Sequence, residues 1–194
     1  MGRVAIGVLL ALLAACGGGG DDAASPEASP VVASDGAQDS ETPQVEAAAS
    51  CGIADFAATA LARINARRAA GASCGSRGSF APAAALRWNE LLAQAAAGHS
   101  ADMAAQNYFS HTSADGRSMT DRVNATGYAW ASLGENIAAG YRDIDSVVEG
   151  WMLSEGHCAN LMNPAFDEIG LACVPGPSGS RYAQYWTQNL ARAR

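Results

Sequence analysis

The chain has 194 residues, 49% hydrophobic and 16% charged, which is the composition of one soluble globular domain with some additional sequence. Its formal net charge of −7 excludes the basic face that a nucleic-acid-binding protein needs, so no nucleic-acid partner is expected. The charge is uneven, because residues 17–50 hold seven acidic residues and no basic one. The remaining sequence is therefore nearly neutral, and the acidity says little about what that part binds.

Residues 1–15 have the pattern of an export signal, with a basic residue at Arg3 and an apolar run that starts at Val4. The run is shorter than the roughly 20 residues that span a bilayer, so it is not expected to be a membrane anchor by itself. The signal ends in two alanines before Cys16, and this ending resembles the lipobox of bacterial lipoproteins. The resemblance implies cleavage before Cys16 and acylation of its thiol, which would attach the protein to a membrane. An ordinary secretory signal with an incidental Cys16 is the alternative.

Residues 16–50 are predicted to be a disordered acidic tether behind the acylated cysteine. They contain no aromatic residue and no hydrophobic period, so they bury too little apolar surface to offset the entropy of ordering. A flexible chain of this length has a root-mean-square reach of roughly 30 Å. Residues 51–194 are predicted to be the folded domain, held at the bacterial cell envelope and facing the periplasm or the exterior.

Four further cysteines indicate disulfide bonds in an oxidising compartment: Cys51, Cys74, Cys158 and Cys173. Four cysteines allow three connectivities. Cys51 and Cys74 bracket the first predicted helix, and Cys158 and Cys173 bracket a helix-to-strand turn, so we predict the pairs 51–74 and 158–173. A metal site is the competing interpretation, but the sequence has no Cys-x-x-Cys pair. A thiol nucleophile at Cys158 beside His157 is disfavoured, because a disulfide removes the thiolate.

Apolar spacing predicts helices and strands in an α+β arrangement. The first helix should end at Gly71, the second should be capped by Asn89, and the last two should be capped by Asp145 and Ser154. The predicted helices are 52–70, one that begins after residue 89, 119–125, one that contains Val148, Trp151 and Met152, and one that ends at Met162. The predicted strands are 168–174 and 182–190, joined as an antiparallel hairpin.

The three histidines differ in their expected surroundings. His99 lies on the apolar face of the second helix, so a hydrogen-bonded core histidine is expected there. His111 follows that helix in a segment that can be an exposed loop. His157 lies at a helix start, where the dipole favours a neutral imidazole. Glu135 is flanked by small and apolar residues, so it should be partly buried and needs partners, which two imidazoles or a metal ion could provide.

These residues lie in blocks that closely resemble the CAP superfamily of cysteine-rich secretory, antigen and pathogenesis-related proteins, and most closely its bacterial SCP-domain branch. The blocks are Phe109-Ser110-His111, Gly134-Glu135-Asn136-Ile137, Trp151 to His157, Ile169-Gly170-Leu171 and Tyr185-Trp186-Thr187-Gln188. The resemblance implies a three-layer α-β-α sandwich with a small antiparallel sheet.

The resemblance also implies a cleft with two histidines and two glutamates, which in several members binds a divalent metal ion such as zinc. By motif, His111, Glu135 and His157 occupy three of these positions, and Glu155 is the candidate for the fourth. Imidazoles and carboxylates suit zinc as ligands. Two alternatives stay open: Glu155 as a solvated carboxylate at a helix start, and a polar network that shapes the cleft without metal.

Two functions follow as expectations, and a structural envelope protein with a vestigial cleft is a third interpretation. The first is an exported, membrane-anchored binding module whose His/Glu cleft recognises a lipid, a glycan or a peptide. The alternative is a metal-assisted hydrolase of peptide or cell-wall bonds with Glu135 as base. The sequence contains no His-Glu-x-x-His motif, no nucleophile elbow and no phosphate-binding glycine loop, so a binding role is favoured. Asp121 and Arg122 are expected to form a structural ion pair or to reach a helix end.

Overall fold

The computed structural model describes residues 49–194; the predicted export signal, Cys16 and nearly all of the acidic tether lie outside these residues. Within the described part, no helix is both long enough and apolar enough to cross a membrane. The elements are α2 (Phe56–Ala70), β1 (Ala72–Ser73), η1 (Gly75–Arg77), β2 (Ser79–Phe80), β3 (Arg87–Trp88), α3 (Glu90–Ala105), α4 (Met119–Ala125), β4 (Trp130–Ala139), α5 (Ile144–Leu153), α6 (Glu155–Met162), β5 (Glu168–Pro175) and β6 (Gln184–Ala193).

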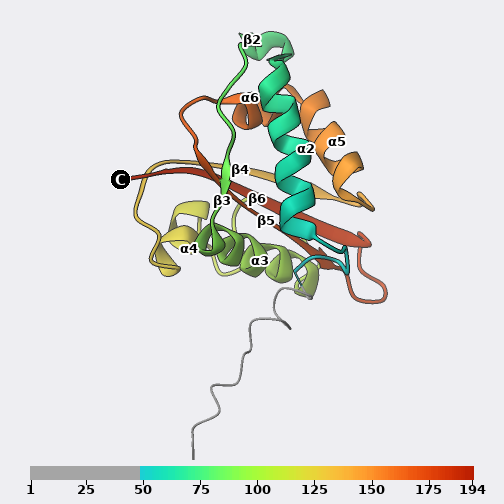
Figure 1. Ribbon diagram of the computed structural model, residues 1–194. Helices are drawn as coiled ribbons and strands as arrows, with labels where there is room; N and C mark the ends of the chain where they lie inside the picture. Colours follow the sequence, from blue (N-terminus) through green and yellow to red (C-terminus); the bar gives the residue numbers. More distant parts are fainter. Residues whose placement is uncertain (1–48) are drawn as a thin grey trace, which may run out of the picture. The chain divides into compact units, whose positions relative to one another are not determined.

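These elements form three layers (Figure 1). The middle layer is a four-stranded sheet in the order β3-β5-β6-β4, in which only the short β3 strand runs parallel to its neighbour. Helices α2, α5 and α6 cover one face of the sheet, and α3 and α4 cover the other. The predicted α+β sandwich is confirmed. The order of the strands also makes β4 an edge strand of the sheet.

Apolar side chains fill the space on both faces of the sheet. The larger cluster joins α2, α5 and α6 to the sheet and includes the fully buried Trp151 and Trp186. On the other face, Leu92, His99 and Met103 of α3 are all completely buried, as the spacing of that helix predicts. Burying a large apolar side chain contributes roughly 1.5–3 kcal/mol, so these two clusters fix the helices on the sheet.

The contact between α3 and the sheet is unusually close at Gly170 of β5. A Cβ atom built on Gly170 would lie 2.0 Å from the backbone nitrogen of Ala93. Only glycine therefore permits this approach of helix to strand. Buried polar side chains on the central strand also join the layers, since Asn189 donates to the carbonyl of Leu92 at 3.2 Å.

Two predicted helix starts are wrong. The first helix begins at Phe56 and not at residue 52, because Cys51, Gly52 and Asp55 all have positive φ values, which an α-helix does not allow. The helix α5 is capped by Asp143 instead of Asp145, through a hydrogen bond of 2.7 Å from the nitrogen of Ser146 to the Asp143 carboxylate. The helix ends and starts at Gly71, Asn89 and Ser154 lie where the sequence places them.

The long strand β4 is not among the strands predicted from the sequence. Strand β4 pairs with β6 along nearly its whole length, with Glu135 opposite Asn189 and Ile137 opposite Thr187. Its middle is polar, and these polar residues are buried, so no alternation of apolar and polar residues reveals it. The β5–β6 hairpin is confirmed, although β6 runs from Gln184 to Ala193 and so lies a few residues later than predicted.

The predicted disulfide pairing is wrong, although all four cysteines are bonded. The bonds join Cys51 to Cys173 and Cys74 to Cys158. Cys51 and Cys74 lie beyond opposite ends of α2, a helix of 15 residues. At 1.5 Å per residue that helix is about 22 Å long, whereas disulfide-bonded Cα atoms are only about 5–6 Å apart. A 51–74 bond would therefore require the short segments on both sides of the helix to fold back along it, and the structure instead bonds each of the two cysteines to a different partner.

The Cys51–Cys173 bond fixes the first described residues to the sheet. Ser50 forms an isolated parallel bridge with Cys173, and two backbone hydrogen bonds link residues 49 and 51 to the same residue, at 2.7 and 3.0 Å. Because the other side of β5 pairs with β6, this attachment lies on the β3 side of the sheet. The chain thus enters the sandwich at the opposite side of the sheet from β4.

Candidate functional site

A cavity of about 570 Å³ lies along the edge strand β4. One wall comes from the loop between α3 and α4, and the other comes from α5 and α6. The cavity is lined by Phe109, Ser110, His111, Ile137, Ala138, Ala139, Tyr141, Gly150, Trp151, Ser154, His157 and Tyr182. None of these residues carries a carboxylate, an ammonium or a guanidinium group. The lining is therefore mainly aromatic and apolar, and its polar side-chain groups are uncharged hydroxyls of two serines and two tyrosines together with an indole N–H and two imidazoles. We refer to this cavity as the cleft.

His111 stands in the cleft wall with its ring held from one side. Its Nδ1 lies 2.7 Å from Oε1 of Glu135, and its side chain is 57% exposed. An ionised carboxylate only accepts hydrogen bonds, so Nδ1 carries the proton in this contact. No residue from 49 to 194 contacts Nε2 in a hydrogen bond. The geometry leaves Nε2 available to a molecule in the cleft.

Glu135 lies behind His111 and is almost completely buried. Its other oxygen, Oε2, accepts a hydrogen bond of 2.6 Å from Nη2 of Arg122, and both side chains are only 4% exposed. Burial acts to raise the pKa of Glu135, but the hydrogen bond from His111 and the charge of Arg122 outweigh it and hold the pKa below its usual value. Glu135 is thus an ionised carboxylate with both oxygens engaged.

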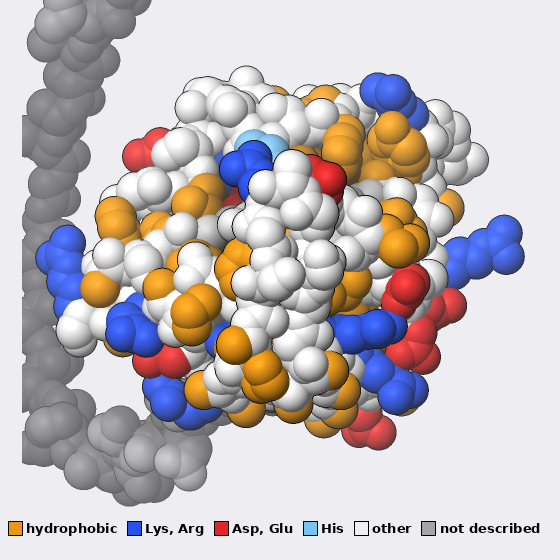
Figure 2. All heavy atoms as spheres, turned by 90° about the horizontal axis from the view of Figure 1, so that it is seen from above, with side chains coloured by type: hydrophobic (Ala, Val, Ile, Leu, Met, Phe, Trp, Pro, Cys, Tyr) orange, Lys and Arg blue, Asp and Glu red, His pale blue; other side chains and the backbone are white. Residues whose placement is uncertain are grey.

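His157 reaches the same cleft from α6, on the opposite wall from His111. Partial burial lowers the pKa of His157, and the proximity of His111 lowers it further. A neutral imidazole is expected there, in agreement with the sequence analysis. The backbone is fixed as well, because Nδ2 of Asn136 donates to the carbonyl of His157 at 3.2 Å. Histidine atoms are visible in one small patch on the face seen in Figure 2.

The structure does not bring Glu155 into the cleft. The carboxylate of Glu155 accepts a hydrogen bond from the hydroxyl of Ser76 in η1, and the residue is exposed. This contact lowers the pKa of Glu155. The predicted fourth member of the cluster is therefore a surface carboxylate that contacts the neighbouring loop, which is the alternative that the sequence left open.

The residues of the cleft do not fit the four-ligand metal centre that the sequence predicted. Within residues 49–194, no group of three or more histidine, cysteine, aspartate or glutamate side chains is arranged to hold a metal ion. Zinc sites with a resident ion have three or four protein ligands. Here two imidazoles face the cleft, whereas Glu135 contacts Nδ1 of His111 from behind, in the position of a group that orients a ligand instead of binding the ion.

Two parts of the site were not recognised from the sequence. The first is the partner of Arg122. The sequence predicts an ion pair for this residue, but no local pattern identifies Glu135 as the partner. The second is an amide network between α6 and β4. Nδ2 of Asn160 donates to the carbonyl of Glu135 and to Oδ1 of Asn136, at 3.1 and 3.0 Å, and Nδ2 of Asn136 donates to Oε1 of Gln188 at 2.8 Å. The unusual polarity of the buried strands is the only sequence signal for it.

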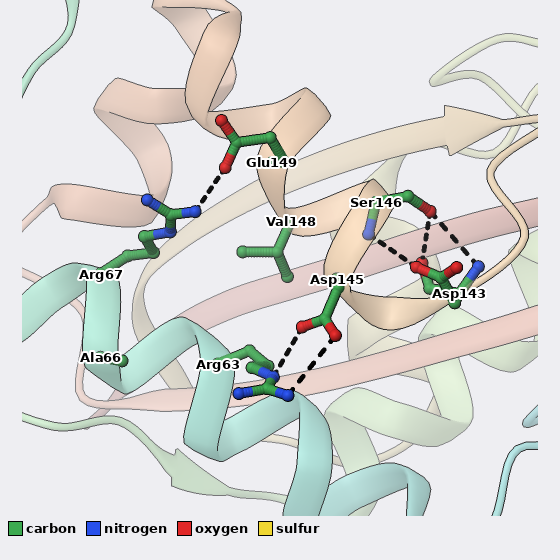
Figure 3. A pocket seen from close by; sticks show the side chains of 8 residues that line it. All are labelled: Arg63, Ala66, Arg67, Asp143, Asp145, Ser146, Val148 and Glu149. Atoms are coloured by element: carbon green, nitrogen blue, oxygen red, sulfur yellow. Dashed lines mark hydrogen bonds and ion pairs between the residues drawn. The ribbon is translucent and has the colours of Figure 1, made fainter.

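A second cavity, of about 630 Å³, lies between α2 and α5 (Figure 3). Two ion pairs cross it: Arg63 with Asp145 at 2.6 Å, and Arg67 with Glu149. All four side chains are about half exposed or more, so this is a surface groove whose charges neutralise one another. It offers no unpaired group to a ligand, and the cleft is the better candidate site.

Comparison with known proteins gives consistent matches. The family model described as "CAP: Cysteine-rich secretory protein family" matches residues 61–190. Among Bacillus subtilis proteins, "Uncharacterized protein YkwD" is 41% identical over 105 residues, which is 54% of this chain and 38% of that protein. "Uncharacterized membrane protein YlbC" is 38% identical over 109 residues, which is 56% of this chain and 29% of that protein. The chain thus spans about a third of the length of these curated relatives.

A solved structure agrees with these matches. It is the crystal structure of an extracellular protein containing an SCP domain from Bacillus anthracis, which is 37% identical with a TM-score of 0.51. The match covers 57% of this chain and 34% of that one. Sequence and structure therefore point to the same family, and the matched region includes both histidines of the cleft.

Proposed function

The chain belongs to the CAP family of cysteine-rich secretory proteins, and from this membership and the cleft we propose that it is an exported binding module of the bacterial cell envelope. Its ligand is a lipid, a glycan or a peptide that enters the cleft between His111 and His157. The family model and the relatives support the CAP domain itself, and the lining of the cleft supports the ligand class.

The composition of the cleft is the observation that carries this proposal. Ligand sites are concave, mostly apolar, and contain a few polar groups that converge on the ligand. The cleft has this character, with aromatic side chains such as Phe109 and Tyr182 beside the two imidazoles. The rings of Phe109 and Tyr182 meet edge to face with centroids 5.9 Å apart, and Phe109 is 40% exposed. An exposed aromatic residue at the rim of a cavity favours contact with an apolar or ring-shaped ligand.

Export is supported by three observations. Two disulfide bonds persist only in an oxidising compartment. One relative is described as a membrane protein and one similar structure as an extracellular protein. The apolar segment before Cys16 provides the signal, and we propose that acylated Cys16 holds the protein at the membrane. Metabolic labelling with a fatty acid tests the anchor: the wild type should be labelled, and the Cys16→Ser variant should not. Equal labelling of the two, or no label on the wild type, contradicts it.

A hydrolase with Glu135 as its base is disfavoured by the geometry. Both oxygens of Glu135 are engaged, one by His111 and one by Arg122, and the side chain is 4% exposed. A general base must come within hydrogen-bond reach of the proton that it removes. No hydroxyl or thiol of the described residues forms a hydrogen bond with His111 either, so none of these side chains is placed as a nucleophile for the pair.

We also propose that the cleft can bind a divalent metal ion. His111 and His157 would be its only protein ligands, with water or ligand groups in the other positions. Two ligands imply weaker binding than a resident zinc site shows. Calorimetric titration of the full-length chain with zinc at neutral pH measures this. Binding is expected to disappear in the His111→Ala/His157→Ala double variant, and binding that persists there refutes the assignment.

The binding function is tested with three defined probes: vesicles that contain phosphatidylglycerol, a soluble peptidoglycan fragment and a casein-derived peptide. Binding of one probe to the full-length chain should be lost in the His111→Ala/His157→Ala variant. The matched control is Arg63→Ala, which alters the charged groove between α2 and α5 and should leave binding unchanged. Equal binding by wild type and double variant, or loss in the control alone, contradicts the proposal. Turnover of casein or peptidoglycan that depends on both histidines would favour the hydrolase.

A further inference from the structure

Arg122 is a buried cation whose contacts converge on the His111 wall of the cleft. The residue is 5% exposed and lies in α4, below the loop between α3 and α4. Its Nη1 donates to three oxygens of that loop, namely the carbonyl of His111 at 3.1 Å, the hydroxyl of Ser113 at 3.0 Å and the carbonyl of Arg117 at 3.1 Å. Its Nη2 donates to Oε2 of Glu135. One guanidinium thus holds both the backbone that carries His111 and the carboxylate behind its ring.

The direction of each hydrogen bond in this chain of contacts is determined by chemistry. A guanidinium has donors and no acceptor, so Arg122 requires an acceptor at Oε2 of Glu135. The ionised carboxylate then presents a second acceptor, Oε1, to Nδ1 of His111. In an uncharged imidazole one nitrogen donates and the other accepts, so a proton fixed on Nδ1 leaves a lone pair on Nε2.

We propose that Arg122 is a positioning residue that sets the tautomer of His111 through Glu135, so that Nε2 acts as a hydrogen-bond acceptor in the cleft. The proposal rests on the proposed function, because it assigns the polarity of one contact in that binding site. Its consequence is a rule for the ligand: the group that meets His111 must be a donor, such as a hydroxyl or an amide N–H. A ligand carboxylate or phosphate would place a second acceptor against the lone pair.

The Glu135→Gln variant tests the proposal, because it should invert the tautomer of His111 instead of merely weakening the order of the site. Arg122 must keep an acceptor at its Nη2, so the amide oxygen of the new side chain should face Arg122. The amide NH₂ then faces His111, Nδ1 becomes the acceptor, and the proton moves to Nε2. If Arg122 causes this orientation, adding Arg122→Met to Glu135→Gln should abolish the preference, since the amide is then free to rotate.

The measurement is a long-range ¹H–¹⁵N correlation spectrum of the full-length chain labelled with ¹⁵N at histidine, recorded at about pH 8.5, two units above the usual histidine pKa of about 6.5. The chain has three histidines, so a His111→Gln spectrum assigns the signal in question. The wild type should show a protonated Nδ1 and an unprotonated Nε2. Circular dichroism checks the fold of each variant.

Arg117→Gln is the matched control, because Arg117 lies in the same loop but its side chain is about half exposed and pairs with Asp115. Its spectrum should equal that of the wild type. An inverted tautomer in Glu135→Gln that disappears in the double variant supports the proposal. A wild-type proton on Nε2, or an unchanged His111 pattern in Glu135→Gln, overturns it. If the double variant does not fold, Arg122→Gln replaces Arg122→Met, because a neutral amide can present either a donor or an acceptor to residue 135 and so imposes no orientation on it. No ligand enters this experiment, so its failure is distinct from failure to bind the three probes.

Discussion

Removal of the Cys74–Cys158 bond should cost a large part of the stability of the fold. The bond closes a loop of 84 residues, for which chain entropy alone gives about 4.6 kcal/mol. The pairing 51–74 would close a loop of only 23 residues and contribute about 3.4 kcal/mol by the same relation. The Cys74→Ala/Cys158→Ala variant should therefore lose about 4.6 kcal/mol of the free energy of unfolding. Alanine is the suitable replacement, because Cys158 is fully buried in an apolar cluster with Met162.

Equilibrium unfolding in urea, followed by circular dichroism, measures this loss. With a typical slope of about 2 kcal/mol per molar urea, the midpoint should fall by about 2 M. The control is Cys51→Ala/Cys173→Ala, whose 122-residue loop predicts a similar loss of about 4.9 kcal/mol. A loss below about 2 kcal/mol, with the remaining disulfide intact by peptide mapping, would refute the argument from loop closure. A mapped bond between Cys51 and Cys74 would refute the pairing itself.

Three further predictions concern packing and burial. Gly170→Ala should destabilise the fold by about 3 kcal/mol or more, because its Cβ would overlap the backbone of α3. Gly98→Ala is the control: a Cβ there meets no atom, so this variant should be neutral or stabilise the helix by up to about 1 kcal/mol. Equal thermal midpoints of the two variants would refute the prediction. Arg68→Met should lower the free energy of unfolding by about 3–5 kcal/mol, since the buried guanidinium donates to four backbone carbonyls. The control Arg63→Met removes one side chain of an exposed ion pair and should lower it by less than about 1 kcal/mol. Urea unfolding measures both losses, and similar values would contradict the prediction. Burial lowers the pKa of His99, so the unfolded chain takes up a proton before the folded chain does as the pH falls below about 6.5. The free energy of unfolding should therefore decline from pH 7 towards pH 5, and this decline should be shallower in His99→Gln. An equal decline in the two proteins would refute the contribution of His99.

The sequence predicts those parts of the fold that depend on local patterns. Helices α3 and α4 and the β5–β6 hairpin follow from apolar spacing and from turn residues close by in the chain. Strand β4 does not, because Gly134, Glu135 and Asn136 interrupt any apolar alternation and the strand is defined by its pairing with β6, some fifty residues later. The prediction of the disulfide pairing is wrong for the same reason. It joined cysteines that are close along the chain, whereas the bonded cysteines are 84 and 122 residues apart.

The candidate site divides in a similar way. The motif blocks identify His111, Glu135 and His157, and the structure brings the first two into contact and the third to the facing wall. Glu155 has the residue type and spacing of a ligand, yet its side chain contacts η1, and only the packing of α6 decides this. The role of Arg122 depends on four acceptors from two separate segments, the loop between α3 and α4 and the strand β4, and no linear pattern contains that information.

The attachment of the first described residues to β5 has a mechanical consequence. Strand β6 and the outer strand β4 separate Cys173 from the cleft, and Cys51 is bonded covalently to Cys173. Tension applied to the polypeptide ahead of residue 49 is therefore carried by a sulfur–sulfur bond to strand β5. This tension does not act directly on the cleft walls that carry the two imidazoles. A particle or surface coupled at that end is therefore connected to the β3 side of the sheet, whereas the cleft lies along the edge strand β4 on the other side.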